Sequence, residues 1–233
     1  MLPFDIIALD ADDTLWQNEL FYKRTEAKFN ELMGNGFDPK NVEEKLLETE
    51  ARNIRLFGYG IKSFMLSMIE TAIDLSDGSI PAQEIRQIID FGREMLEQDV
   101  QLLPGVAETL PVLASQYRLM LITKGDLLDQ ESKLARSGLA DYFAEVEIIS
   151  DKDVAGYRRI LQRHGLTPQR FLMVGNSLRS DILPVLEMGG SAVYIPFELA
   201  WAHEMADTPL AGQNGFYELK SISELPEFLQ SIA

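Results

Sequence analysis

The sequence contains no cysteine and has few basic residues relative to its acidic ones. The lack of cysteine excludes disulfide bonds, thiol catalysis and metal sites built on thiolates. With 21 lysine and arginine residues against 37 aspartate and glutamate residues, the formal net charge is -16, which argues against a nucleic-acid or anionic-membrane partner. A phosphate ester would also be repelled at long range, so a site for one requires a local excess of positive charge.

The N-terminal region lacks a basic segment and a long apolar run. Its first apolar run stops at Asp10, too early for a signal peptide or a membrane-spanning helix. We therefore expect a cytoplasmic enzyme with no membrane partner. The 233 residues are 46% hydrophobic, which is enough to bury the core of one domain or of two modest ones.

Residues 4–16 form the most informative stretch, because a short apolar run there ends in three carboxylates. Residues 6–9 predict a strand buried on both faces, as in parallel sheets covered by helices. Ligands of such sheets bind beyond the carboxyl ends of the strands, where Asp10, Asp12 and Asp13 are expected. Like charges this close indicate a metal, a shared proton or both. The alternative is an acidic turn in which Asp10 or Asp12 caps a helix.

The segment after this strand is helical in pattern. Asn41 and Glu44 resemble a capping box, and an apolar stripe continues from Ile61 to Ile73. Predicted helices lie near residues 19–33, from about 41 to 57, at 61–73 and at 79–96.

Beyond residue 103, strands and helices alternate. This alternation predicts an α/β fold with a Rossmann-like, doubly wound parallel sheet. Residues 1–16 and 101–233 would form this core domain, and residues 17–100 an inserted four-helix domain. Predicted strands are 118–123, 145–150, 170–175, 191–196 and 216–219, and predicted helices are 126–136, 153–163, 180–188 and 223–232.

The pattern Asp10-x-Asp12-x-Thr14 after a buried strand resembles the first signature of the haloacid dehalogenase superfamily of phosphatases and phosphomutases. Most members have glycine where this chain has Asp13, so the departure is expected to add a carboxylate at the mouth of the site. In that family an insertion after the first signature is a cap that closes over the active site and selects the substrate. The resemblance implies this role for residues 17–100.

Two further segments resemble later signatures. Thr123 ends the apolar run 119–123, and the resemblance implies that its hydroxyl holds a phosphoryl oxygen, with Lys124 in the same pocket. Lys152 matches the lysine that neutralises the nucleophile and the incoming phosphate. The alternatives are a threonine that bonds its local backbone and a solvated surface lysine.

Residues 174–181 resemble the fourth signature, which in many relatives begins Gly-Asp and has a second Asp five residues later. Asn176 replaces the first acid, so it offers an amide oxygen without a negative charge. The resemblance implies Mg²⁺ held by the Asp10 carboxylate and the Asp12 backbone carbonyl. Asn176 and Asp181 would complete the set, the latter directly or through water. Alternatively, Asn176 supports a turn and Asp181 caps a helix.

The resemblance implies a phosphatase that acts on a small phosphorylated metabolite. Asp10 would form an aspartyl-phosphate, and Asp12 would protonate the leaving oxygen and then activate water. Because an ordinary aspartate has a pKa of about 3.9, the site would have to raise that of Asp12. A phosphomutase would keep all these residues, whereas a 2-haloacid dehalogenase needs neither Mg²⁺ nor Asp12. A non-catalytic binding module is the third alternative, suggested by Asp13 and Asn176.

The inserted segment offers one candidate for substrate contact. Residues 55–62 contain two glycines, two aromatic residues and two cations between predicted helices. We expect Tyr59 and Lys62 to contact the substrate. The alternative is that the glycines only end one helix and start the next.

Overall fold

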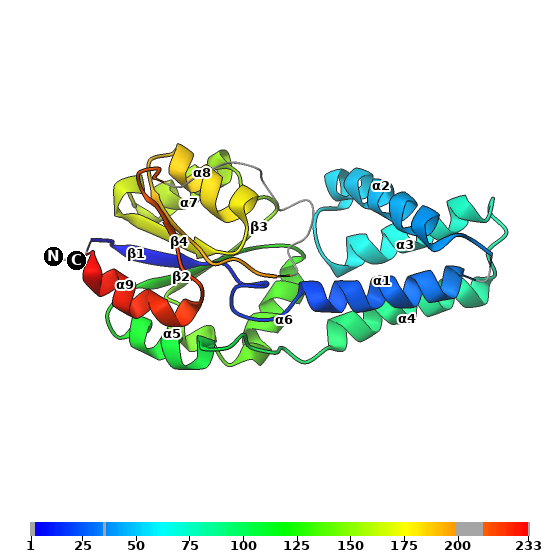
Figure 1. Ribbon diagram of the computed structural model, residues 1–233, viewed down its shortest axis with the longest axis horizontal. Coiled ribbons are helices and arrows are strands. Elements are labelled where there is room, and N and C mark those ends of the chain that lie inside the picture. Colours follow the sequence, from blue (N-terminus) through cyan, green and yellow to red (C-terminus); the bar gives the residue numbers. More distant parts are fainter. Residues whose placement is uncertain (1–2, 35, 199–211, 233) are drawn as a thin grey trace. The chain divides into compact units, whose positions relative to one another are not determined.

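A parallel β-sheet forms the core of the protein (Figure 1). The computed structural model describes residues 3–34, 36–198 and 212–232. The strands within these ranges are β1 (Ile6–Leu9), β2 (Leu119–Lys124), β3 (Glu145–Ile149), β4 (Phe171–Gly175), β5 (Ser191–Tyr194) and β6 (Phe216–Glu218). Their order in the sheet is β3-β2-β1-β4-β5-β6, and every neighbouring pair is parallel. The predicted α/β class and parallel sheet are therefore confirmed.

Helices follow the strands along the chain and cover the sheet. The prediction missed α5, which contains Pro111; a proline inside a helix removes one backbone hydrogen bond and weakens the sequence signal. It also merged a π-helical segment, η3, with α8. The bounds are α5 (Val106–Ala114), α6 (Leu127–Ser137), α7 (Val154–His164), η3 (Leu178–Ile182), α8 (Leu183–Glu187) and α9 (Leu225–Ser231), with short 3-10 turns η1 (Ala140–Tyr142), η2 (Pro168–Arg170) and η5 (Ile222–Glu224).

Strand β1 lies at the centre of the sheet, between β2 and β4. Its side chains alternate between two cores, and all four residues are 0% exposed. Ile7 and Leu9 belong to the core that contains residues of α5 and α9, whereas Ile6 and Ala8 belong to the core with residues of α7 and α8 on the opposite face (Figure 1). Burial on both faces explains the unbroken apolar run.

A second compact unit is helical. It comprises the described residues within Leu20–Asp99 together with Gly125–Asp129, and the remainder forms the sheet unit. Its core includes Phe64 and Met68 of the predicted stripe, but Ile73 is 42% exposed and lies outside that core. Within the part of the chain described, no helix is both long enough and apolar enough to span a membrane. The helices of this region are α1 (Glu19–Met33), α2 (Pro39–Phe57), α3 (Ile61–Leu75) and α4 (Ala82–Glu97).

Helix α2 begins earlier than predicted. Asp38 is its N-cap residue and accepts a hydrogen bond from the backbone N–H of Asn41 at 3.3 Å, and Pro39 occupies the first helical position. The predicted capping box at Asn41 and Glu44 is therefore wrong. Asp38 already satisfies a free N–H of the first turn, and proline fits the first position because its missing N–H would have no helical partner.

Candidate active site

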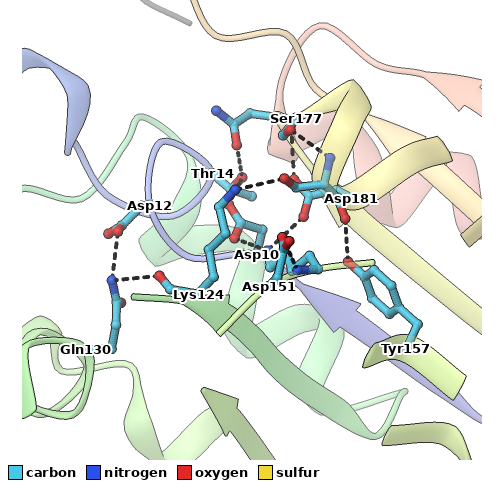
Figure 2. Close-up of polar contacts among 12 residues, drawn as sticks. Asp10, Asp12, Thr14, Lys124, Gln130, Asp151, Tyr157, Ser177 and Asp181 are labelled. Atoms are coloured by element: carbon cyan, nitrogen blue, oxygen red, sulfur yellow. Dashed lines mark hydrogen bonds and ion pairs between the residues drawn. The ribbon is translucent and has the colours of Figure 1, made fainter. Parts of the chain in front are cut away.

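Asp10 lies directly beyond the carboxyl end of β1 and is 6% exposed. Its backbone N–H donates to the carbonyl oxygen of Val174 in β4 at 2.9 Å, which fixes it at the edge of the sheet. Its Oδ2 accepts a hydrogen bond from the hydroxyl of Thr14 at 2.9 Å, and its Oδ1 accepts one from Nζ of Lys152. Both oxygens of this carboxylate therefore have a fixed orientation (Figure 2).

Lys152 connects Asp10 with Asp181. Its Nζ lies 2.7 Å from Oδ1 of Asp181, and the lysine is 3% exposed. Burial alone would lower the pKa of Lys152, but the two adjacent carboxylates outweigh burial and raise it. Burial raises the pKa of Asp10 to about 7, although Lys152 opposes this effect. Two carboxylates around one ammonium leave a negative charge uncompensated, so the group favours an additional proton or cation.

Asp181 reaches this position because its side chain folds back over the end of β4. Its Oδ2 accepts a hydrogen bond from the backbone N–H of Ser177 at 3.0 Å. A Cβ atom on Gly175, the last residue of β4, would lie 2.3 Å from this same oxygen. Only glycine leaves room for the carboxylate there, which gives a steric reason for the glycine of the sequence pattern.

Asn176 lies near Asp10 through Thr14. The hydroxyl of Thr14 is 2.9 Å from Oδ2 of Asp10 and 3.3 Å from Oδ1 of Asn176, so it lies between the two side chains. It has a single proton and donates to one of them at a time. The structure thus brings the amide oxygen of Asn176 to the same edge of the sheet as the nucleophile candidate.

The oxygen atoms of Asp10, Asn176 and Asp181 fit a magnesium ion in their chemistry. All are hard oxygen donors, the class that Mg²⁺ prefers, and the Asp10, Lys152 and Asp181 side chains carry a residual negative charge. No group of three or more His, Cys, Asp or Glu side chains suited to a metal occurs among the described residues. A site here would therefore rest on two carboxylates, with the amide and a backbone carbonyl as further ligands.

Asp12 lies apart from these groups. Its Oδ1 accepts hydrogen bonds from Nε1 of Trp16 at 2.6 Å and Nζ of Lys133 at 3.1 Å, and its Oδ2 accepts one from Nε2 of Gln130 at 2.8 Å. Figure 2 shows the carboxylate directed toward Gln130. These three donors were not predicted from the sequence. In the structure, Gln130 and Lys133 lie on the buried face of α6 beside Leu134.

Thr123 and Lys124 end β2 at the same edge of the sheet. Thr123 is 1% exposed. Nζ of Lys124 donates to the hydroxyl of Ser180 at 2.8 Å, and Ser180 immediately precedes Asp181. The structure therefore brings Lys124 beside the Asp181 segment.

Asp13 does not add a carboxylate at the mouth of the site, contrary to expectation. Its Oδ1 accepts hydrogen bonds from the backbone N–H groups of Asn18 at 2.8 Å and Glu19 at 3.1 Å, at the start of α1. Its φ is 60°, a left-handed conformation that glycine adopts freely and aspartate tolerates. Asp13 thus satisfies two N–H groups that begin the helix, at a position where a glycine would offer no acceptor.

Tyr59 and Lys62 belong to the helical unit. Tyr59 lies in the turn between α2 and α3, and Lys62 is in the first turn of α3. Nζ of Lys62 lies 3.0 Å from both carboxylate oxygens of Asp126 in the same unit. Lys62 is therefore an ion-paired cation, a feature that the sequence did not indicate.

Two comparisons of sequence indicate the relatives of the chain. A family model described as haloacid dehalogenase-like hydrolase matches residues 4–189. The chain is 36% identical over 106 residues to the glyceraldehyde 3-phosphate phosphatase of Methanothermobacter thermautotrophicus, a match that covers 42% of the chain and 46% of that protein. The chain thus spans about half the length of this curated relative.

Solved structures resemble the chain over nearly its whole length. A haloacid dehalogenase-like family hydrolase from Xanthomonas campestris has a TM-score of 0.87 and 39% identity, covering 99% of this chain and 92% of that one. A 2-haloacid dehalogenase from Pseudomonas syringae pv. Tomato has a TM-score of 0.63 and 26% identity, covering 99% and 100%. The similarity therefore includes both the sheet and the helical insertion.

Proposed function

Because the chain belongs to the haloacid dehalogenase-like hydrolase family, we propose that it is a phosphatase that hydrolyses the phosphate monoester of a small metabolite. The observation that carries this proposal is the fixed carboxylate of Asp10, held by Thr14 and Lys152 at the carboxyl end of β1. A phosphatase among the curated relatives supports the choice of a phosphate ester.

The first proposed step transfers the phosphoryl group to Asp10. A carboxylate oxygen of Asp10 bonds to phosphorus while the bond from phosphorus to the ester oxygen breaks, and its electron pair stays on that oxygen. Asp12 donates a proton to the departing oxygen, which leaves as an alcohol, and Asp12 becomes a carboxylate.

The second proposed step hydrolyses the aspartyl-phosphate. Water attacks phosphorus and loses a proton to the Asp12 carboxylate, and the bond from phosphorus to Asp10 breaks. Inorganic phosphate leaves, Asp10 is again a carboxylate and Asp12 is again protonated. Thr123, Lys124 and Lys152 would bind the phosphoryl oxygens, because donors and cations there offset the charge that develops during transfer.

Mg²⁺ would be held by the Asp10 carboxylate, the Asp12 backbone carbonyl, Asn176 and Asp181. When bound, it would offset the negative charge of the phosphoryl group. The helical unit would act as the cap that selects the substrate, with Tyr59 and Lys62 as its candidate contacts.

A 2-haloacid dehalogenase is an alternative function on the same fold. Its reaction needs no proton for the leaving halide, and Asp12 would then have no chemical role. The presence of an acid at Asp12 therefore favours the phosphatase, and in the structure this carboxylate is partly buried and held by three donors. A phosphomutase would return the phosphoryl group to substrate and release no phosphate.

Phosphate release from 4-nitrophenyl phosphate tests the proposal, measured with Mg²⁺ and with EDTA, for the wild type and Asp10→Asn. We expect Mg²⁺-dependent release in the wild type and a loss of several orders of magnitude in the variant, because the amide is a poor nucleophile of nearly the same shape. Chloride release from 2-chloropropionate instead would identify a dehalogenase. Absence of both phosphate release and chloride release would support a non-catalytic binding module. Near-normal activity in Asp10→Asn would contradict the mechanism.

A further inference from the structure

The hydrogen-bond donors around Asp12 come from two separate parts of the sheet unit. Trp16 lies four residues after Asp12, whereas Gln130 and Lys133 lie one turn apart on α6. All three are buried: Trp16 is 1% exposed, Gln130 3% and Lys133 9%. Long polar side chains lose rotamer entropy when they are buried, so holding two of them against one carboxylate is a costly arrangement.

The three donors restrict both oxygens of Asp12. Trp16 and Lys133 bind Oδ1, Gln130 binds Oδ2, and Nζ of Lys133 is also 3.3 Å from Oδ2. Lys133 is itself fixed by the side-chain oxygen of Asn18 at 2.9 Å. A carboxylate held on both oxygens by buried partners keeps one orientation, whereas an unheld aspartate samples several rotamers.

This orientation fits the demands of an in-line phosphoryl transfer. The proton must reach the ester oxygen on the side of phosphorus opposite the nucleophile. The proton donor must therefore lie about one phosphoryl group away from Asp10 and not in contact with it. The carboxylate of Asp12 shares no hydrogen-bond partner with that of Asp10, which Thr14 and Lys152 hold, and Figure 2 draws it toward Gln130. The two carboxylates are therefore held independently of each other, as a nucleophile and a separate proton donor require.

We propose that Gln130 and Lys133 are positioning residues that hold the side chain of Asp12 for proton transfer to the leaving oxygen. The inference rests on the proposed phosphatase function. Neither residue touches the reacting atoms, and both act through Asp12. Loss of either should slow the reaction most where the leaving oxygen needs a proton, because a good leaving group departs without one.

Two substrates of similar shape separate this role from a structural one. Phenyl phosphate has a poorer leaving group than 4-nitrophenyl phosphate. For Gln130→Met and Lys133→Met, we expect kcat/KM for phenyl phosphate to fall about 10-fold and that for 4-nitrophenyl phosphate to fall less than about 3-fold. The value of kcat/KM is the right measure, because it reports the steps up to departure of the leaving group.

Three comparisons control the experiment. Arg136→Met removes a cation one turn further along α6 and should leave the ratio of the two kcat/KM values unchanged. Lys133→Arg keeps a donor and a positive charge and should restore most of the ratio. In an Asp12→Asn background, Lys133→Met should not change the ratio further, since the group that it positions is absent.

The outcomes distinguish the positioning role of Gln130 and Lys133 from the phosphatase function. Equal losses on both substrates, an unchanged ratio, or an additional change in the Asp12→Asn background would overturn the positioning role while leaving the phosphatase intact. If Lys133→Met does not fold, Gln130→Met alone decides, because it removes the hydrogen bonds to Asp12 and to the carbonyl oxygen of Lys124 but no charge. A wild type that releases phosphate from neither substrate would overturn the proposed function and this inference together.

Discussion

A Cβ atom on Gly175 would lie 2.3 Å from Oδ2 of Asp181 and 2.4 Å from its Cγ, both far inside van der Waals contact. Asp181 cannot move without disturbing its contacts with Lys152 and Ser177. We therefore expect Gly175→Ala to lower the free energy of unfolding by about 1–3 kcal/mol, as overpacking does, and to weaken Mg²⁺-dependent turnover. Urea denaturation and phosphate release measure the two effects. Gly36→Ala is the matched control, because no atom lies within 4 Å of its Cβ; an equal loss there would contradict the steric explanation.

Asp13 should make stability depend on pH. Burial raises its pKa to about 7 in the folded chain, from the ordinary value of 3.8. Its stabilising effect is then complete below about pH 4, is lost as the pH rises toward 7, and stays lost above. Asp13→Asn does not titrate, keeps an acceptor oxygen and tolerates the φ of 60°. The free energy of unfolding of Asp13→Asn minus that of the wild type should therefore increase by about 2–3 kcal/mol from pH 5 to pH 8.

Urea denaturation at several pH values without Mg²⁺ measures this difference. Asp13→Ala serves as the comparison, since it has no acceptor and strains the backbone, and it should be less stable than Asp13→Asn at every pH. A difference between wild type and Asp13→Asn that stays constant with pH would show that folding does not disfavour the ionised carboxylate.

Asn176 should weaken metal binding because it brings an oxygen but no charge. Asn176→Asp adds a negative charge beside Asp10 and should lower the Mg²⁺ concentration for half-maximal activity by about 10-fold, a change of about 1.4 kcal/mol. Asp181→Asn makes the opposite change and should raise that concentration. Titration of activity with Mg²⁺ tests both, and an unchanged requirement in Asn176→Asp would remove this residue from the ligand set.

Lys62 offers a test of substrate selection by the helical unit. Its side chain is 52% exposed although it is paired with Asp126, so the ammonium remains accessible and the ion pair contributes little stability. We expect Lys62→Met to change the order of preference among phosphorylated metabolites without altering the Mg²⁺ requirement, and Tyr59→Phe to do so more weakly. Asp126→Asn leaves the ammonium in place and should preserve the order. The same change in both variants would mean that Lys62 serves only to hold Asp126.

The strands could be predicted from the sequence because their apolar pattern depends only on neighbouring residues. A strand buried on both faces is apolar at every position, as residues 6–9 are, and it ends where polar residues begin. Helix α5 and the π-helical segment η3 were harder: Pro111 interrupts the helical pattern of the first, and the second departs from the 3.6-residue period by which helices are recognised. The start of α2 was misplaced because Asp38 and Asn41 both carry side chains suited to capping.

The position of a side chain at the edge of the sheet was predictable where it follows or ends a strand, as Asp10 follows β1 and Thr123 lies near the end of β2. Lys133 and Gln130 were not, since they come from a helix whose contact with Asp12 spans more than a hundred residues of chain. Nor was the orientation of Asp13, because a carboxylate in sequence does not reveal which N–H groups it will bind. Long-range side-chain partners depend on the packing of α6 against the sheet.

The central position of β1 has a consequence for local opening. Its residues pair with β2 on one side and β4 on the other, so its amide protons can exchange with deuterated water only when the sheet itself opens. Exchange from β1 should therefore report the global free energy of unfolding, whereas helix ends and surface turns exchange through smaller fluctuations. Asp10 directly follows β1, so its backbone is held by the part of the sheet that we expect to open most slowly.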